Sequence, residues 1–319
     1  MSSGNPPRRR ERTRFEWPTF LLLFFTYSVW ATVTIFYAAI DPWLALPILA
    51  VVLAFHSSLQ HEIIHGHPFR DQRLNDALVF PAIGLLIPYE RFRTTHLAHH
   101  FDPLLTDPYD DPESNYLDPA VWNRLRRPTR AILALNNTLI GRVTIGAVLG
   151  TVWFWGKDIV AMRKGDREVA RAYLLHALGA VPVLAWLALL GTIPFWAYLI
   201  CCWLALSLLR IRTFLEHRAH ERHGARSVII EDRGPLALLF LNNNFHAVHH
   251  AHPRLAWYQL PAEYARRREE FLRRNDHYVY RSYIEVLGRY LFHRKDPVAH
   301  PIWTPPEGHK SEGHGPAGR

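Results

Sequence analysis

The sequence predicts an all-α integral membrane protein with four transmembrane helices in two hairpins and a cytoplasmic helical cap. None of the 37 Lys and Arg residues falls within residues 19–58 or 172–209, and each window can cross a bilayer core of about 30 Å twice. Four crossings also return every positive residue to one side, which the positive-inside rule assigns to the cytoplasm. We expect one membrane domain with its cap over residues 19–295, between a basic segment (1–18) and a disordered tail (296–319).

The first predicted hairpin follows the basic segment. Residues 1–18 contain five arginines and are expected to stay in the cytoplasm; no base-reading module follows them, so we expect no nucleic-acid partner. Residues 19–40 form the first span, and residues 43–59 form the second. The second helix continues outward, so it presents His61 and His65 just beyond the membrane.

No span is predicted between the hairpins. Residues 78–88 are apolar but too short to cross a bilayer, and we expect a half-buried or interfacial helix there. Residues 102–113 are acidic and interrupted by prolines, which predicts an ordered loop. Residues 120–171 alternate basic and apolar patches, as is typical of helices that lie in a membrane interface.

The second predicted hairpin consists of residues 172–190 and 193–209, joined by a charge-free turn. A continuation of its last helix brings His217 and His220 beyond the membrane on the same side as the first pair of histidines. One layer just outside the lipid then collects histidines from both hairpins.

Eight histidines occur in three short clusters with helical spacing. Spacings of three and four residues put side chains on one face of a helix, about one turn apart. Imidazole is the commonest neutral metal ligand, so the clusters predict a polyhistidine metal site. The adjacent Cys201 and Cys202 indicate neither a disulfide framework nor a thiolate site. The clustered residues are His61, His65, His96, His99, His100, His246, His249 and His250.

The stretch His61-Glu62-Ile63-Ile64-His65 leaves another interpretation open. It matches the HExxH pattern of zinc peptidases, in which the glutamate is the general base. A catalytic zinc takes about three protein ligands, whereas eight clustered histidines, or nine with His217, suit two metal ions with open positions. Imidazole-rich sites accept iron, so ligand number favours a di-iron, oxygen-activating site over a membrane zinc metallopeptidase.

On these motifs the chain resembles the membrane fatty-acid desaturase superfamily, which includes related hydroxylases, over roughly residues 19–260. Its three histidine clusters are similar to the three histidine boxes of that superfamily. His217 matches an additional ligand that acyl-CoA desaturases carry after the fourth span, with His220 as the alternative. The resemblance thus implies nine metal ligands: His61, His65, His96, His99, His100, His217, His246, His249 and His250.

The resemblance also implies the chemistry. Two iron ions would reduce O2, the co-substrate, and oxidise an unactivated C–H bond with electrons from a separate protein. The chain has no His-Pro-Gly-Gly stretch of a fused haem domain, so we expect a donor such as ferredoxin or rubredoxin with its reductase. A site just above the lipid favours an acyl chain or a similar hydrocarbon as substrate.

Neutral histidine ligands need hydrogen-bond partners that orient and polarise them. We expect such partners among the polar side chains close to the clusters in the sequence. His67 is off the helical face of the first cluster and is expected in this supporting role or in a structural one. The candidates are Glu62, His67, Asp102, Asp107, Glu216, His220 and Asp232.

The motifs do not separate two reactions. Introduction of a double bond into a fatty acyl chain or similar lipid is the leading interpretation. A membrane hydroxylase is the alternative, because residues 107–114 are similar to an Asp-Pro-containing stretch of membrane alkane hydroxylases. We expect the protein in a bacterial inner membrane, with its termini and active site in the cytoplasm.

Overall fold

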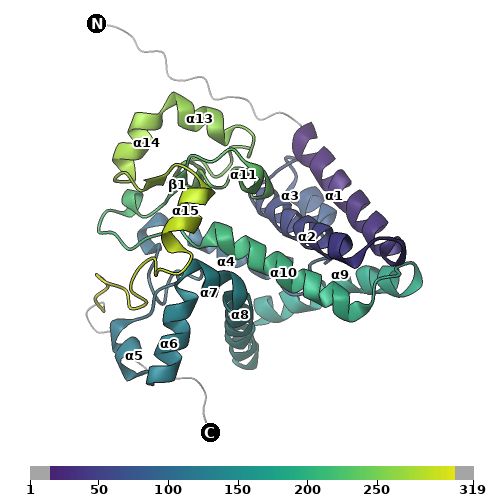
Figure 1. Ribbon diagram of the computed structural model, residues 1–319, viewed down its shortest axis with the longest axis horizontal. Helices are drawn as coiled ribbons and strands as arrows, with labels where there is room; N and C mark the ends of the chain where they lie inside the picture. The colour runs from purple at the N-terminus through teal and green to yellow at the C-terminus, as the bar shows by residue number, and fades with distance from the viewer. Residues whose placement is uncertain (1–14, 306–319) are drawn as a thin grey trace, which may run out of the picture.

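A computed structural model describes residues 15–305, apart from the side chain of Asp102. This part of the chain is mostly helical and contains one small parallel sheet (Figure 1). The all-α prediction is therefore confirmed. Residues 1–14 and 306–319, which fall in the predicted basic segment and tail, lie outside the described residues.

Four helices among the described residues are long and apolar enough to cross a membrane. Helices α1 (Trp17–Ile35) and α2 (Pro42–Ile64) form one hairpin, and α9 (Arg167–Leu189) and α10 (Phe195–Thr213) form the other. The two hairpins pack on each other through α2 and α10. The predicted pair of hairpins is confirmed.

Local sequence sets where these helices begin and how they meet. The Asp41 carboxylate accepts a hydrogen bond from the Trp43 N–H, and Pro42 occupies the first turn of α2, both of which favour a helix start. Trp30 of α1 donates its Nε1–H to the hydroxyl of Tyr198 on α10 at 2.8 Å. This buried hydrogen bond joins the hairpins within an apolar core.

The helix predicted over residues 78–88 is wrong. Helix α3 (Gln72–Leu78) ends where this segment begins, and α4 (Tyr89–His99) starts after it. Prolines and a glycine interrupt the segment, and partners far along the chain hold its backbone instead. The Tyr198 hydroxyl donates to the Ile83 carbonyl at 2.6 Å, and the Ala82 N–H donates to the Gly179 carbonyl at 3.0 Å. The segment is an apolar loop wedged between the second hairpin and α4.

Residues 102–171 lie beside the hairpins and contain no further candidate span. The predicted loop after α4 is present, with a single turn of 3-10 helix, η2 (Asp102–Leu104). Four helices follow, and α7 and α8 pack against α10 (Figure 1). Helix α8 exposes Val152 and Trp153 by 61% and 63%, which favours contact with lipid. The helices are α5 (Pro119–Arg124), α6 (Arg127–Asn136), α7 (Leu139–Thr144) and α8 (Gly146–Arg163).

The chain after α10 forms the larger part of the cap. Strand β1 (Ile229–Ile230) pairs in parallel with β2 (Val279–Tyr280), so Ile229 faces Val279. This pairing closes the segment that contains the third histidine cluster. The helices here are η3 (His223–Ala225), α11 (Pro235–Leu239), α12 (His246–Ala251), α13 (Leu260–Arg266), α14 (Arg268–Arg274) and α15 (Tyr283–Tyr290).

The tail predicted to be disordered from residue 296 packs against the cap as far as residue 305. Ala299 bridges to Leu117, His300 is 5% exposed, and the Trp303 Nε1–H donates to Asp107 at 2.9 Å. The high content of Pro, Gly and His in this segment predicted disorder, but a few buried side chains are enough to order a short extended segment.

Candidate metal centre

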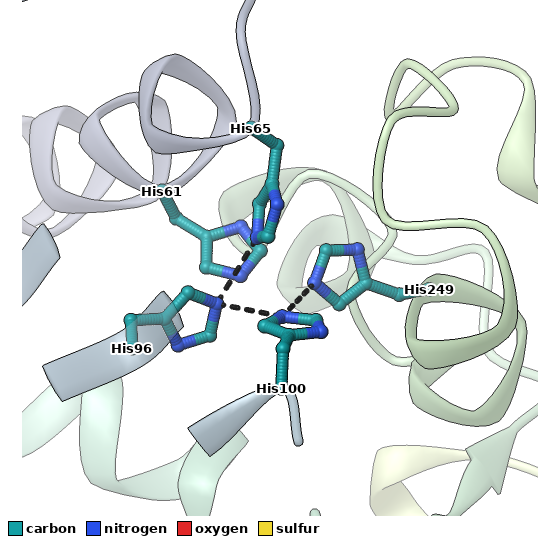
Figure 2. A group of neighbouring side chains, drawn as sticks. All are labelled: His61, His65, His96, His100 and His249. Carbon is teal, nitrogen blue, oxygen red and sulfur yellow. Dashed lines mark hydrogen bonds between the residues drawn. The ribbon is translucent and has the colours of Figure 1, made fainter. Parts of the chain in front are cut away.

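The nine predicted histidine ligands lie in two neighbouring groups. Within each group the ligand nitrogens lie within 4.8 Å of one another, which is close enough to surround a single ion. Figure 2 shows the side chains of the first group pointing toward a common centre. The first group is His61, His65, His96, His100 and His249, and the second is His99, His217, His246 and His250.

Helical spacing decides which histidine joins which group. In α4, His96 and the residue that ends the helix, His100, are four apart and join the first group, while His99 joins the second. In α12 the pair four apart, His246 and His250, joins the second group, and His249 joins the first. Residues four apart share a helix face. Helices α4 and α12 therefore each supply ligands to both groups.

His217 completes the second group, and His220 does not. The Nε2 atom of His217 lies 2.8 Å from Nε2 of His99 and 3.0 Å from Nε2 of His246. The helix α10 ends at Thr213, so a bridge between His217 and Ser227 positions this ligand instead of the helix we expected. His220 lies 3.4 Å from Asp276, and it therefore serves neither as the ninth ligand nor as a partner of the ligands.

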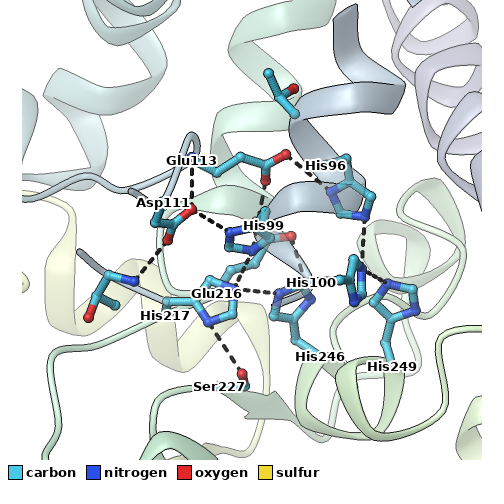
Figure 3. A network of polar contacts seen from close by, with 12 residues as sticks. His96, His99, His100, Asp111, Glu113, Glu216, His217, Ser227, His246 and His249 are labelled. Atoms are coloured by element: carbon cyan, nitrogen blue, oxygen red, sulfur yellow. Dashed lines mark hydrogen bonds and ion pairs between the residues drawn. The ribbon is translucent and has the colours of Figure 1, made fainter. Parts of the chain in front are cut away.

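Two carboxylates that were not among the predicted partners contact the ligands most directly (Figure 3). His99 Nδ1 lies 2.8 Å from Asp111 Oδ1, and His96 Nδ1 lies 3.1 Å from Glu113 Oε1. Burial alone would raise the pKa of Glu113, but the adjacent His99 and His96 hold it far below its usual range. Both residues belong to the acidic run that follows the second cluster, and this proximity was the signal in the sequence.

Glu62 and Glu216, which we predicted as partners, lie beside the ligands without a short contact to them. Glu62 accepts from the Trp257 N–H at 3.1 Å and lies 3.9 Å from Nδ1 of His61. Glu216 forms an ion pair with Arg212 at 3.0 Å and lies 3.8 Å from Nδ1 of His246. Burial raises the pKa of Glu216. Neither carboxylate is therefore as close to a ligand nitrogen as Asp111 or Glu113.

The remaining predicted partners have structural contacts. Asp107 accepts from Trp303 and from two N–H groups of its own turn. Asp232 accepts from the N–H groups of Gly234 and Tyr283. His67 lies 2.6 Å from the buried Glu16, which anchors the chain just before α1. Asp107 and Asp232 therefore have other partners than the predicted ligands, and His67 has the structural contact that was one of its two expected roles. The side chain of Asp102 lies outside the described residues.

The protonation pattern of the histidines fits metal cations. The Nδ1 atoms of His96 and His99 face carboxylates, and Nδ1 of His246 faces the amide oxygen of Asn243 at 3.1 Å. A ring that binds a metal through Nε2 would carry its proton on Nδ1, beside such a partner, and present the Nε2 lone pair to the centre of its group. Lone pairs about 3 Å apart repel unless a cation lies between them. Nε2 of His61 is also buried without a hydrogen-bond partner.

The electrostatics of the cap also favour metal cations in the two histidine groups. Burial and, to a smaller extent, the neighbouring imidazoles lower the pKa of the ligands in the cap. These rings are therefore neutral, as metal binding requires. They are His65, His100, His217, His246 and His249. His99 differs. Burial alone would lower its pKa, but Glu113 and Asp111 outweigh this and raise it to about 9. These carboxylates make the second group a favourable place for positive charge.

A cavity of about 1030 Å³ reaches the second group from among the membrane helices. His99 and His217 line it at one end. Elsewhere its wall is largely apolar, with side chains from α2, α8, α9 and α10 that include Leu53, Phe154 and Leu206. An apolar molecule in this cavity would place part of its length beside the second group.

Comparison with known proteins agrees with this geometry. A sequence model of the family described as Fatty acid desaturase matches residues 38–282. The chain belongs to the fatty acid desaturase family. The match includes all nine histidines and begins just after α1, and a search among curated proteins finds no match. This desaturase-family protein is therefore an integral membrane oxidoreductase of the desaturase and hydroxylase type.

Proposed function

We propose that this chain is an O2-dependent di-iron oxidoreductase that introduces a double bond into a fatty acyl chain or a similar lipid. The observation that carries the proposal is the convergence of nine histidines in two groups at the end of a largely apolar cavity. The apolar part of the cavity offers a hydrocarbon chain a path toward the second group of histidines.

Each group of histidines would hold one iron ion. The first would be bound by His61, His65, His96, His100 and His249, and the second by His99, His217, His246 and His250. Two bound irons would supply the reduction of O2 and the oxidising power to remove hydrogen from an unactivated C–H bond. The two groups are adjacent, since His96, His99 and His100 belong to one short helical segment.

The protein's own groups orient the ligands and shape the site. Asp111 and Glu113 accept the Nδ1 protons of His99 and His96, which holds each Nε2 lone pair toward its group. Such partners also increase the basicity of the coordinating nitrogen. Asn243 does the same for His246, and its own amide donates to Glu216 at 3.3 Å. The ligand set is therefore rigid before any substrate enters.

The geometry does not favour the zinc peptidase that the HExxH stretch allowed. Five histidines gather in the first group, which exceeds the three protein ligands of a typical catalytic zinc. Glu62, which would be the general base, accepts a backbone hydrogen bond from Trp257. A carboxylate held in this way is poorly placed to activate a water molecule.

Hydroxylation of an alkyl or acyl chain is the second candidate. The stretch of residues 107–114, whose sequence is similar to that of membrane alkane hydroxylases, supplies both Asp111 and Glu113. Both reactions begin with the same removal of hydrogen and differ in whether oxygen is then transferred. Analysis of the product therefore distinguishes the two reactions.

Electrons are proposed to come from a separate carrier such as ferredoxin or rubredoxin with its reductase. The net charge of +9 supports an acidic partner, because opposite charges speed the encounter of two proteins. The positive-inside rule supports a cytoplasmic site at a bacterial inner membrane. The same net positive charge would also attract anionic lipid headgroups.

The test combines metal content with product analysis. Detergent-purified protein should contain two irons per chain, and one zinc without iron would support the peptidase instead. In a host that also expresses a reductase and ferredoxin or rubredoxin, desaturation removes two hydrogens from a lipid, whereas hydroxylation adds one oxygen. His249→Ala should abolish either product and leave the membrane topology unchanged. Full activity of this variant would contradict the proposed ligand set.

A further inference from the structure

Two arginines that line the cavity form no ion pair with a carboxylate of the described residues. Arg142 lies on α7, and Arg210 lies in the last turn of α10. Both line the same cavity that reaches His99 and His217. Guanidinium groups are uncommon in a largely apolar cavity because their desolvation is unfavourable without a counter-ion.

The carboxylates that line the cavity already have other partners. Asp158 pairs with Arg91 at 2.8 Å, and Glu216 pairs with Arg212 at 3.0 Å. Asp76 accepts from Tyr89, and Glu113 is held by histidine ligands as described above. Their charges are therefore largely offset within the protein.

Neither Arg142 nor Arg210 has a carboxylate within 4.0 Å among residues 15–305. Arg142 donates to the amide oxygen of Asn115 at 2.6 Å, but its Nε is buried without a partner. Within this part of the chain, the side chain of Arg210 makes no hydrogen bond. Two positive charges with unused donors thus face one cavity.

Helix α8 is shaped to accommodate both side chains. A Cβ atom at Gly150 would overlap with Nη2 of Arg210, and one at Gly146 would lie 3.2 Å from Cδ of Arg142. These two glycines are four residues apart and so lie on one face of the helix. Burial and then the nearby charge of Arg210 lower the pKa of Arg142 to about 9. A bound anion would offset both the burial of Arg142 and its repulsion by Arg210.

We propose that Arg142 and Arg210 bind the anionic head group of the substrate, a carboxylate or a phosphate. The occupant is then a single-chain amphiphile whose hydrocarbon lies in the apolar part of the cavity. This inference rests on the proposed function, because it takes the occupant of the cavity to be the substrate. The head group fixes one end of the chain, and this determines which carbon lies beside the second group of histidines.

The test measures binding by the full-length, metal-loaded protein in a neutral detergent, without O2 or an electron donor. The probes are palmitate, monohexadecyl phosphate and the uncharged palmityl alcohol. Charge-assisted hydrogen bonds should make at least one anion bind about tenfold more tightly than the alcohol. The ratio of the two anions identifies the carboxylate or the phosphate as the preferred group.

Variants assign this preference to the two arginines. The double variant Arg142→Gln and Arg210→Gln should lose it and keep its affinity for the alcohol. Arg163→Gln, which removes an exposed charge from the end of α8, should retain the preference. If the double variant does not fold, Gly150→Ala provides the same readout, because the new methyl displaces only the flexible end of Arg210.

Equal binding of anions and alcohol by the wild-type protein would overturn the inference. So would a preference that survives in the double variant or, where that variant does not fold, in Gly150→Ala. Neither result depends on turnover. A protein that prefers the anions but oxidises no lipid would contradict the proposed function and leave the anion site standing.

Discussion

The Nδ1 atom of His99 lies 2.8 Å from the carboxylate of Asp111, and both side chains are almost completely buried. Oδ2 of Asp111 also accepts from the Thr106 N–H at 2.8 Å. The carboxylate is therefore fixed by the backbone of its loop and in turn fixes the orientation of a metal ligand. This relationship makes the loop after α4 part of the metal centre.

Replacing Asp111 with Asn should weaken the second metal position without removing a ligand. The amide can still accept the His99 proton, but it carries no charge to polarise the ring. Loss of such a partner typically lowers metal affinity or activity by about 10–100-fold. Iron content and product formation measure the effect. Asp107→Asn, in the same loop and remote from the ligands, is the control, and equal behaviour of the two variants would contradict the assignment.

His217 and His220 should respond differently to substitution by alanine. His217→Ala removes a nitrogen from the second group and should reduce iron content and abolish product formation. His220→Ala removes a partly exposed contact with Asp276 and an acceptor for the Arg222 N–H, and exposed contacts of this kind contribute little. Iron analysis of the two purified variants separates them. If His220→Ala lost iron and His217→Ala kept it, the ninth ligand would be misassigned.

Removal of the metal ions by a chelator should lower both the thermal stability and the activity of the protein. Without cations, buried nitrogen lone pairs face one another in both groups, so metal binding contributes directly to the folded state. A chelator should lower the midpoint of thermal unfolding by several degrees, and iron should restore both the midpoint and product formation. Zinc should restore at most the midpoint, so recovery of activity with zinc would contradict a di-iron function.

Gly179→Ala should destabilise the protein through the loop of residues 79–88. A Cβ at this position would overlap with the Phe80 carbonyl oxygen, which belongs to rigid backbone. Overpacking of this kind costs about 1–3 kcal/mol, which would appear as a lower thermal midpoint. Gly156→Ala is the matched control, because nothing lies within 4 Å of a Cβ there. If both variants melted together, the loop would not depend on this close approach.

Much of the architecture could be predicted because it depends on local sequence. The charge-free windows located both hairpins, and spacings of three and four residues identified the histidines of α4 and α12. The sequence could not show how these histidines divide between two groups, because the division depends on where each helix face points after packing. The sequence indicated that His217 lies near the other histidines. It could not show what fixes the position of His217, because a bridge to Ser227 holds it rather than a continuation of α10.

Several of the errors concern contacts that the folded chain makes beyond the neighbouring turn. Residues 78–88 are apolar enough for a helix, yet Tyr198 and Gly179 bind their backbone from the second hairpin. Asp111 and Glu113 reach the ligands because their loop turns back on itself, with Thr106 at a positive φ of 71°. Composition alone placed Trp303 in a disordered tail, whereas its indole reaches Asp107.

The supply of ligands to both histidine groups by α4 and α12 has a mechanical consequence. Each helix is a rigid body, and each contributes ligands to both groups. A small rotation of either helix that opened one coordination sphere would distort the other at the same time. We therefore expect the two ions to be gained and lost as a pair, and protein with a single ion to be a minor species during assembly.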